Sequence, residues 1–264
     1  MTFYQNWRDI MCIIFIAYRC HPNYNLITAA NRDEFYKRPT KAAYFWEDNP
    51  SILAGRDLEQ MGTWMGVTRT GRFAALTNYR NPSEFEKADK KSRGHIVRDF
   101  LAGDESSFEF LKKLQQENLN YRGFNLFVSD GDSLMYYSNI GNEIKQLEPG
   151  IYGLSNDQLD TPWPKVEKGK RKLKQMLDNG LNHEQLFALL GDQETAPEEK
   201  LPRTGVPLQL EKTLSSIFIK SPDYGTRCST VLTIDQNQKI HFIEKTFMSH
   251  GADEKEFTFI SEKN

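Results

Sequence analysis

Short apolar runs separated by turn residues dominate the first part of the chain and predict strands. Residues 12–18 form an apolar run with the length of a buried strand, and residues 26–30 form a second run after the turn residues 21–23. The two runs therefore predict an antiparallel hairpin. Its second strand leads directly into residues 31–34, Asn-Arg-Asp-Glu, which we expect to form a charged turn.

The same pattern of paired apolar runs occurs three more times along the chain. Gly71 and Gly131 stand between the runs of two pairs, where glycine readily adopts the positive φ of a tight turn. Antiparallel pairing should therefore dominate the fold. The expected strand pairs are 63–68 with 72–77, 124–129 with 133–138, and 228–234 with 240–245.

Apolar residues at helical spacing fall between these strand pairs. They predict helices at 94–101, 107–116, 163–177 and 183–190, with Ser106 and Asn182 as N-caps. Strand pairs interrupted by helix pairs favour a layered α+β fold over the strict alternation of a doubly wound sheet. The polar stretch 191–200 is typical of a loop insertion.

Composition and charge limit the class of protein. The 264 residues are 38% hydrophobic and 27% charged, which predicts one ordinary globular domain, residues 12–264. Residues 1–11 are interpreted as a leader or a mis-assigned start. A net charge of −2 disfavours nucleic acid as a partner. Neither a membrane span nor a secretory signal is evident, so we expect a cytoplasmic protein.

Cys12 is the first candidate for chemistry. If the chain starts at Met11 and loses that methionine, Cys12 carries both a thiol and a free α-amine. An α-amine with a pKa near 8 can accept the thiol proton and later protonate a leaving amine. The alternative is that Cys12 is an inert residue of a buried strand, a common place for a free cysteine.

The segment 31–34 is the second candidate, because the hairpin would bring it near Cys12. Arg32 beside the thiol would favour the thiolate, and Asp33 could orient the amine or the arginine. The alternative is a solvated turn with an internal ion pair. Six cationic residues between 165 and 174 give a later helix a basic surface, which we interpret as a solvated face.

Several short blocks in a fixed order carry a more specific signal. The chain resembles the NRDE family, the transport-and-Golgi-organisation proteins, over residues from 11 to the C-terminus. The blocks are Met11-Cys12, 31–35 (NRDEF), 62–66 (GTWMG), 75–79 (ALTNY), 152–156 (YGLSN), 160–166 (DTPWPKV) and 224–227 (YGTR).

The resemblance implies a fold similar to N-terminal-nucleophile hydrolases, a four-layer αββα sandwich of two antiparallel sheets between helices. It implies a catalytic role for six residues and a substrate contact for three. The implied catalytic residues are the nucleophile Cys12, its neighbours Arg32, Asp33 and Arg227, and the oxyanion donors Asn78 and Asn156. The implied substrate contacts are Asn31, Trp64 and Tyr79, although a tryptophan such as Trp64 is also typical of a core.

Two functions remain open from the sequence. The first is an N-terminal-cysteine amidohydrolase that cleaves a linear, non-peptide amide through the Cys12 thiolate without a cofactor. The second is a non-catalytic binding or trafficking protein for an apolar ligand such as haem or an acyl-CoA. Cys20 and His21 are possible haem ligands, and no histidine has the spacing of a metal site. The oligomeric state is not specified by the sequence.

Overall fold

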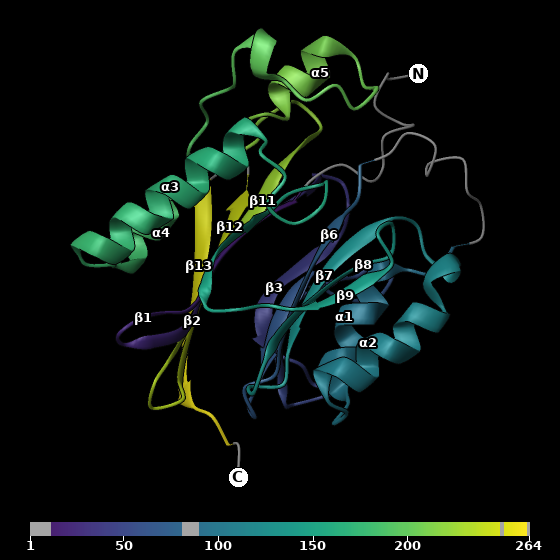
Figure 1. The fold of residues 1–264 in the computed structure, drawn as a ribbon, viewed down its shortest axis with the longest axis vertical. Coiled ribbons are helices and arrows are strands. Elements are labelled where there is room, and N and C mark those ends of the chain that lie inside the picture. The colour runs from purple at the N-terminus through teal and green to yellow at the C-terminus, as the bar shows by residue number, and fades with distance from the viewer. Residues whose placement is uncertain (1–11, 81–89, 249–250, 263–264) are drawn as a thin grey trace.

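Two antiparallel sheets form the centre of the molecule. The computed structural model describes residues 12–80, 90–248 and 251–262. One sheet has the strand order β10-β1-β2-β11-β12-β13 and the other β3-β4-β5-β6-β7-β8-β9 (Figure 1). The first sheet consists of β1 (Cys12–His21), β2 (Tyr24–Phe35), β10 (Gly150–Leu154), β11 (Tyr224–Asp235), β12 (Lys239–Met248) and β13 (Gly251–Ile260). The second consists of β3 (Thr40–Phe45), β4 (Ile52–Asp57), β5 (Met65–Thr68), β6 (Phe73–Asn78), β7 (Phe124–Ser129), β8 (Leu134–Ser138) and β9 (Glu143–Gln146).

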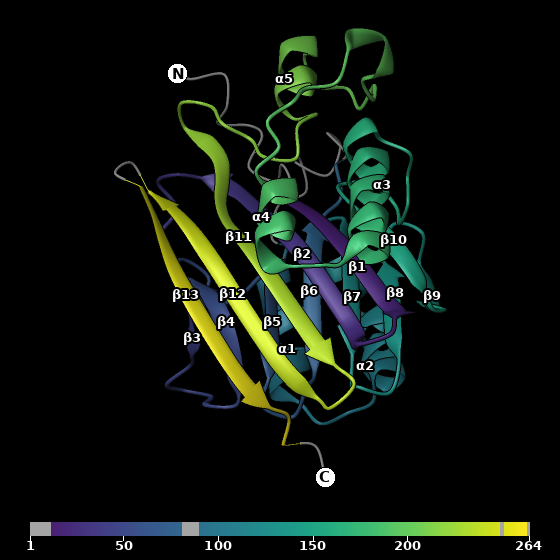
Figure 2. The same ribbon diagram turned by 90° about the vertical axis from the view of Figure 1, so that its left-hand side faces the viewer.

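Helices cover the outer face of each sheet. Helices α1 (Arg93–Ala102) and α2 (Ser107–Gln116) lie on the seven-stranded sheet, and α3 (Pro164–Asn179) and α4 (His183–Leu190) lie on the six-stranded sheet (Figure 2). The predicted four-layer αββα sandwich is therefore confirmed. Shorter elements are α5 (Leu208–Thr213) and the 3-10 helices Asn118–Asn120 and Glu198–Lys200. Within the described residues, no helix combines the length and apolar character that a membrane span requires.

The main core lies between the two sheets, where alternate strand residues meet. Ile14 and Ile16 of β1 pack there with Phe73, Phe127 and other buried residues of the facing sheet. The intervening residues Ile13 and Phe15 point the other way, under α3 and α4. Each strand of the hairpin thus contributes to two cores, which fixes its register because a shift of one residue would exchange the two faces.

The predicted hairpins and helices are confirmed, each within a few residues of its expected bounds. Gly71 and Gly131 have φ of +81° and +94° at the two turns where positive φ was expected. Ser106 and Asn182 both form capping boxes at the N-termini of α2 and α4. The stretch 191–200 is largely irregular, as predicted, and ends in the short 3-10 helix.

The prediction of a charged turn at 31–34 is wrong, because these residues are the last part of strand β2. Cys12 of β1 and Cys228 of β11 both pair with Arg32, so β2 has a partner on each side. Asn31, Arg32 and Asp33 are buried. Neighbouring strands satisfy the backbone groups, and partners from distant segments satisfy most side-chain atoms, which allows polar residues in a buried strand.

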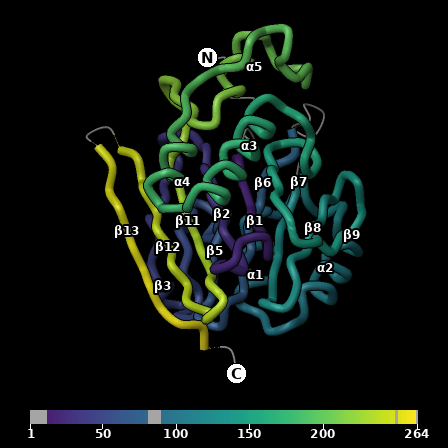
Figure 3. The backbone as a smooth tube through the Cα atoms, turned by 60° about the vertical axis from the view of Figure 1, so that its left-hand side comes forward, coloured from purple at the N-terminus to yellow at the C-terminus, as the bar shows by residue number. Residues whose placement is uncertain are grey.

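The segment that follows α4 covers the end of the six-stranded sheet where β1 begins. This segment, with α5, lies across that end of the molecule (Figure 3). Its residues reach the sheet through hydrogen bonds: the Asn31 amide donates to the carbonyl oxygen of Ile217 at 2.9 Å, and the backbone N–H of Ile219 donates to the Thr226 hydroxyl of β11 at 2.9 Å. The start of β1 is therefore enclosed on its outer side.

Candidate functional site

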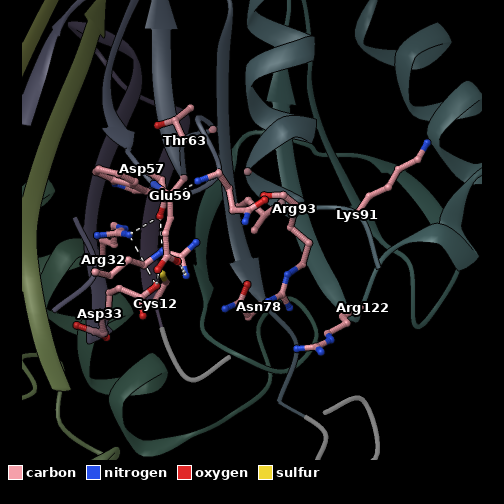
Figure 4. A pocket seen from close by; sticks show the side chains of 18 of the residues that line it. Cys12, Arg32, Asp33, Asp57, Glu59, Thr63, Asn78, Lys91, Arg93 and Arg122 are labelled. Carbon is pink, nitrogen blue, oxygen red and sulfur yellow. Dashed lines mark hydrogen bonds and ion pairs between the residues drawn. The ribbon is translucent and has the colours of Figure 1, made fainter. Parts of the chain in front are cut away.

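A cavity of about 360 Å³ lies beside the start of β1 and is lined by residues of both sheets and of the N-terminal turn of α1. Cys12, Arg32 and Asp33 lie together on one wall, and Lys91, Arg93 and Arg122 lie across from them (Figure 4). Asn78 lies between the two groups. With Trp64, which also lines this cavity, the structure brings together five of the nine site residues expected from the sequence.

Arg32 is held in place by acids and by an aromatic ring. Its guanidinium donates to Asp57 at 3.3 Å and lies 3.7 Å from Glu34. On the other side, its central carbon lies 4.3 Å from the centre of the Trp64 ring. The Trp64 ring lines the cavity and also packs against the main core, and its contact with a substrate stays a prediction. No motif or pattern in the sequence had indicated Asp57 as a residue of the site.

The Cys12 thiol is protonated at neutral pH in the full-length chain. Burial raises its pKa to about 12, and the nearby negative charge of Asp33 raises it as well. A hydrogen bond from the Asp33 backbone N–H and the charge of Arg32 act in the opposite direction but are outweighed. Arg32 thus lowers the pKa of the thiol, as expected, but the net pKa is raised and not low as expected.

Asp33 is a buried carboxyl group with one unsatisfied oxygen. Oδ1 accepts the Thr226 hydroxyl, whereas Oδ2 has no hydrogen-bond partner among the described residues. Burial raises the pKa of Asp33 to about 7, and the Thr226 hydrogen bond and the positive charges of Lys165 and Arg32 limit the rise. A donor placed near Oδ2 would therefore be bound strongly.

The two candidate oxyanion donors have different positions. Asn78 lines the cavity, and its side-chain amide makes no hydrogen bond within the described part of the chain. Asn156 is fully buried, and its amide donates to the backbone carbonyl of Asn78 at 2.9 Å. Asn78 is thus available to a ligand, and Asn156 fixes the backbone that carries it.

Three other expected site residues do not line this cavity. Asn31 faces the helices and binds backbone carbonyls there. Tyr79 lies beside Asp157, whose negative charge contributes to the raised pKa of its hydroxyl after burial. Arg227 donates to the backbone carbonyls of Phe35, Tyr36 and Arg38 at 2.8, 3.1 and 3.1 Å. Arg227 therefore fastens the turn after β2 rather than contacting a cavity ligand.

Comparison with known proteins identifies the family. The family model described as Transport and Golgi organisation 2 matches residues 11–249. The chain belongs to this family. The Transport and Golgi organization protein 2 homolog of Bos taurus is 39% identical over 92% of this chain and 95% of its own length. The Drosophila melanogaster Transport and Golgi organization protein 2 is 28% identical over 89% of this chain and 92% of its own length.

Among solved structures, this Transport and Golgi organisation 2 family chain is similar to two hydrolases at low identity. The Caenorhabditis elegans ortholog of N-acylethanolamine-hydrolyzing acid amidase has a TM-score of 0.47 and 11% identity, covering 84% of this chain and 92% of that chain. A mutant conjugated bile acid hydrolase from Clostridium perfringens has a TM-score of 0.39 and 9% identity, covering 96% of this chain and 89% of that chain.

The cavity of this Transport and Golgi organisation 2 family member is predominantly polar. The basic residues Lys90, Lys91, Arg93 and Arg122 line one side of it. The large apolar side chains in its lining are Trp64 and Leu76 among the described residues. This lining presents charged and polar groups and little apolar surface.

A second cluster of buried charge near Cys12 was not predicted. The Arg80–Glu211 ion pair, at 2.8 Å, is almost completely buried. Lys165, which we had placed on a solvated helix face, is also buried, so that interpretation is wrong for this residue. Lys165 follows Pro164 at the start of α3, and the rotation of that helix, which the sequence does not specify, turns it inward.

Proposed function

We propose that this protein is an N-terminal-cysteine amidohydrolase once Cys12 is its first residue. The observation that carries the proposal is the placement of Cys12 at the start of β1, on the wall of a cavity, beside Arg32 and the buried carboxyl of Asp33. Thiol, α-amine, arginine and carboxylate would then share one wall, which is the set of groups that amide cleavage by a cysteine requires.

The reaction follows from those groups. The α-amine of Cys12 takes the thiol proton, and the thiolate attacks the carbonyl carbon of a linear, non-peptide amide. The carbonyl oxygen gains negative charge, and the Asn78 amide, which lines the cavity, is placed to donate to it. Collapse breaks the carbon–nitrogen bond, and the protonated α-amine gives its proton to the leaving amine. Water then hydrolyses the thioester and restores the thiol.

The state of Cys12 in the full-length chain explains why residues 1–11 must be removed. An amide-bonded nitrogen is not basic, so the thiol has no base within its own residue. Its pKa of about 12 keeps it protonated, and the thiol is a poor nucleophile. Residues 1–11 lie outside the described residues, and the family match starts at residue 11. Activity should therefore depend on exposure of Cys12.

Covalent labelling tests the proposal. The protein is purified from its native host, its first residue is determined, and iodoacetamide labelling of each cysteine is followed at pH 7. We expect Cys12 to react faster than the exposed Cys20, because its own amine generates the thiolate. Cys228, which is buried, provides an internal control for unfolding. A Cys12 that reacts no faster than Cys228 would sink the proposal.

A second candidate function is a non-catalytic binding or trafficking protein for haem or an acyl-CoA, held through the anionic groups that these largely apolar ligands carry. Two observations favour it: the protonated Cys12 thiol of the full-length chain, and the basic residues Arg93 and Arg122 in the cavity lining. Carboxylates of haem or phosphates of coenzyme A would pair with such residues. The names of the relatives, which refer to transport and Golgi organisation, also support a role of this kind.

Titration with haem or an acyl-CoA separates the two places where such a ligand could bind. Cys20 and His21 are at the opposite end of β1 from Cys12, so axial ligation there and binding in the cavity are independent. Binding that is lost in Arg122→Ala and retained in His21→Ala would assign the ligand to the cavity. No saturable binding of either compound would exclude this function for the tested ligands.

A further inference from the structure

Lys165 brings a buried positive charge to the start of β1 from the helix side of the sheet. Only 3% of the residue is exposed, and its Nζ donates to the carbonyl oxygen of Leu214 at 3.0 Å. A fully buried lysine is uncommon, because its charge loses hydration unless anions nearby compensate. A lysine that served only solubility would lie on the surface, so the burial of Lys165 calls for another explanation.

Two glycines fix the helix that carries Lys165. A Cβ atom on Gly169 of α3 would lie 2.0 Å from the Phe15 ring of β1, and one on Gly153 of β10 would lie 2.8 Å from Val166. These positions must be glycine for α3 to lie this close to the sheet. The close approach holds the first turn of α3, and with it Lys165, against the start of β1.

The charge of Lys165 acts on Asp33 and Cys12. Burial lowers the pKa of Lys165 to about 7, the positive charge of Arg80 lowers it too, and Asp33, Cys12 and Glu211 raise it. Asp33 of β2 lies on the same, helix side of the sheet, and one of its carboxylate oxygens lacks a partner among the described residues. Tyr224 of β11 adds a neutral hydroxyl, whose own pKa is raised by burial and by Asp33.

Resting on the proposed function, we propose that Lys165 is a positioning residue whose charge disfavours protonation of both the Cys12 α-amine and the Asp33 carboxylate. A positive charge beside the amine disfavours the ammonium form. The same charge stabilises the carboxylate of Asp33, whose Oδ2 then accepts a hydrogen bond from the amine and directs the nitrogen lone pair toward the thiol. Without Lys165, the carboxylate alone would favour the ammonium, which cannot act as a base.

The test measures iodoacetamide labelling of Cys12 between pH 5.5 and 9 in the processed protein from its native host. Lys165→Met removes the charge and keeps most of the volume. We expect its labelling midpoint to rise by about one pH unit and labelling at pH 7 to slow about tenfold, because each pH unit changes the reactive fraction tenfold. Lys165→Arg provides a permanent positive charge and should leave the midpoint at or below that of the wild type.

Lys168→Met is the matched control, because Lys168 lies on the same helix and pairs with Asp192 and Glu194 at 2.6 and 2.5 Å, away from Cys12. Its midpoint should equal that of the wild type. A merely structural role for Lys165 would lower the thermal midpoint of unfolding and leave the labelling midpoint unchanged, which would overturn the inference. An unreactive Cys12 in the wild type would instead contradict the proposed function itself.

Discussion

Asn31 and Asp33 lie two residues apart on the same face of β2, yet their polar atoms are satisfied to different degrees. The Asn31 amide donates to the carbonyls of Leu190 and Ile217, each at 2.9 Å, and its oxygen accepts the Ser229 hydroxyl at 2.6 Å. Asp33 accepts one hydrogen bond, from Thr226, and its other oxygen has no partner among the described residues. A satisfied residue fastens the fold, whereas an unsatisfied carboxylate oxygen can bind a reacting group.

Arg32, between these two residues, points to the opposite side of the sheet. It faces the cavity with Cys12, to which it is paired across the strands. The polar segment is thus divided by strand geometry, because successive side chains point to opposite faces. The side chains of Asn31 and Asp33 point to the helix side and that of Arg32 to the cavity, and Asp33, near the end of β2, also lines the cavity beside Cys12. The four predictions below test this division, from the largest expected effect to the smallest.

Asn31→Asp should have the largest effect, and on stability. The substituted oxygen would face the carbonyls of Leu190 and Ile217, which need a donor, and would bury a charge. We expect the free energy of unfolding to fall by about 4 kcal/mol in urea denaturation at pH 7. Asn23→Asp, on the exposed hairpin after β1, is the control and should change it by less than about 0.5 kcal/mol. A similar, small change in both variants would contradict the structural role of Asn31.

Asp33→Asn should affect reactivity and leave the protein folded. The change keeps the shape, preserves an acceptor for Thr226 and removes a buried charge. We expect Cys12 labelling in the processed protein to slow by roughly 100-fold, about 2.7 kcal/mol, since the carboxylate no longer orients the amine. Asp178→Asn, an exposed position on α3, should react like the wild type. Wild-type rates in Asp33→Asn would show that Asp33 is not part of the site.

Asp33 should also make stability depend on pH. Its pKa is raised in the folded state to about 7 from an ordinary value of 3.8, so the folded protein binds a proton that the unfolded chain has released. The stabilisation present below pH 4 is therefore lost as pH rises through 7. Between pH 4.5 and 7.5 we expect this carboxyl to cost on the order of 2 kcal/mol of unfolding free energy. Urea denaturation of Asp33→Asn at the two pH values should show less of this loss; equal losses would contradict the raised pKa.

The smallest effect concerns the cavity face. The Trp64 ring and the Arg32 guanidinium are in contact, and such pairs contribute about 1 kcal/mol when partly buried. A double-mutant cycle with Trp64→Leu and Arg32→Met, measured by urea denaturation, should give a coupling energy of about that size. A cycle with Trp64→Leu and Arg56→Met, whose guanidinium packs on Trp46 instead, is the control and should give no coupling.

The hairpins could be predicted because their signals are local. Gly71 and Gly131 mark tight turns between apolar runs, and Ser106 and Asn182 mark helix starts. Strands β3, β4, β9, β10 and β13 were not predicted. Most residues of β9 and β13 are exposed, so these two strands lack the apolar run that marks a buried strand. Such strands are edge strands of their sheets, where one side has no partner.

The sequence provided candidate site residues, five of which line the cavity, but it did not indicate how they are arranged. Residues 31–34 are polar, so their pattern predicts a turn, and the partners that allow their burial are far away in the chain. Lys165 occurs in a run of cationic residues, most of which are partly or fully exposed. Only the packing of α3 on β1, through Gly169, distinguishes it from its neighbours. Tertiary contacts of this kind have no local sequence signal.

The first residue of the protein purified from its native host tests the central claim most directly. Intact mass and N-terminal peptide sequencing report it without any knowledge of the substrate. The proposed hydrolase requires a chain that begins at Cys12 with an unmodified amine. A chain that retains residues 1–11, or that carries a blocked amine on Cys12, would contradict the claim that Cys12 supplies its own base.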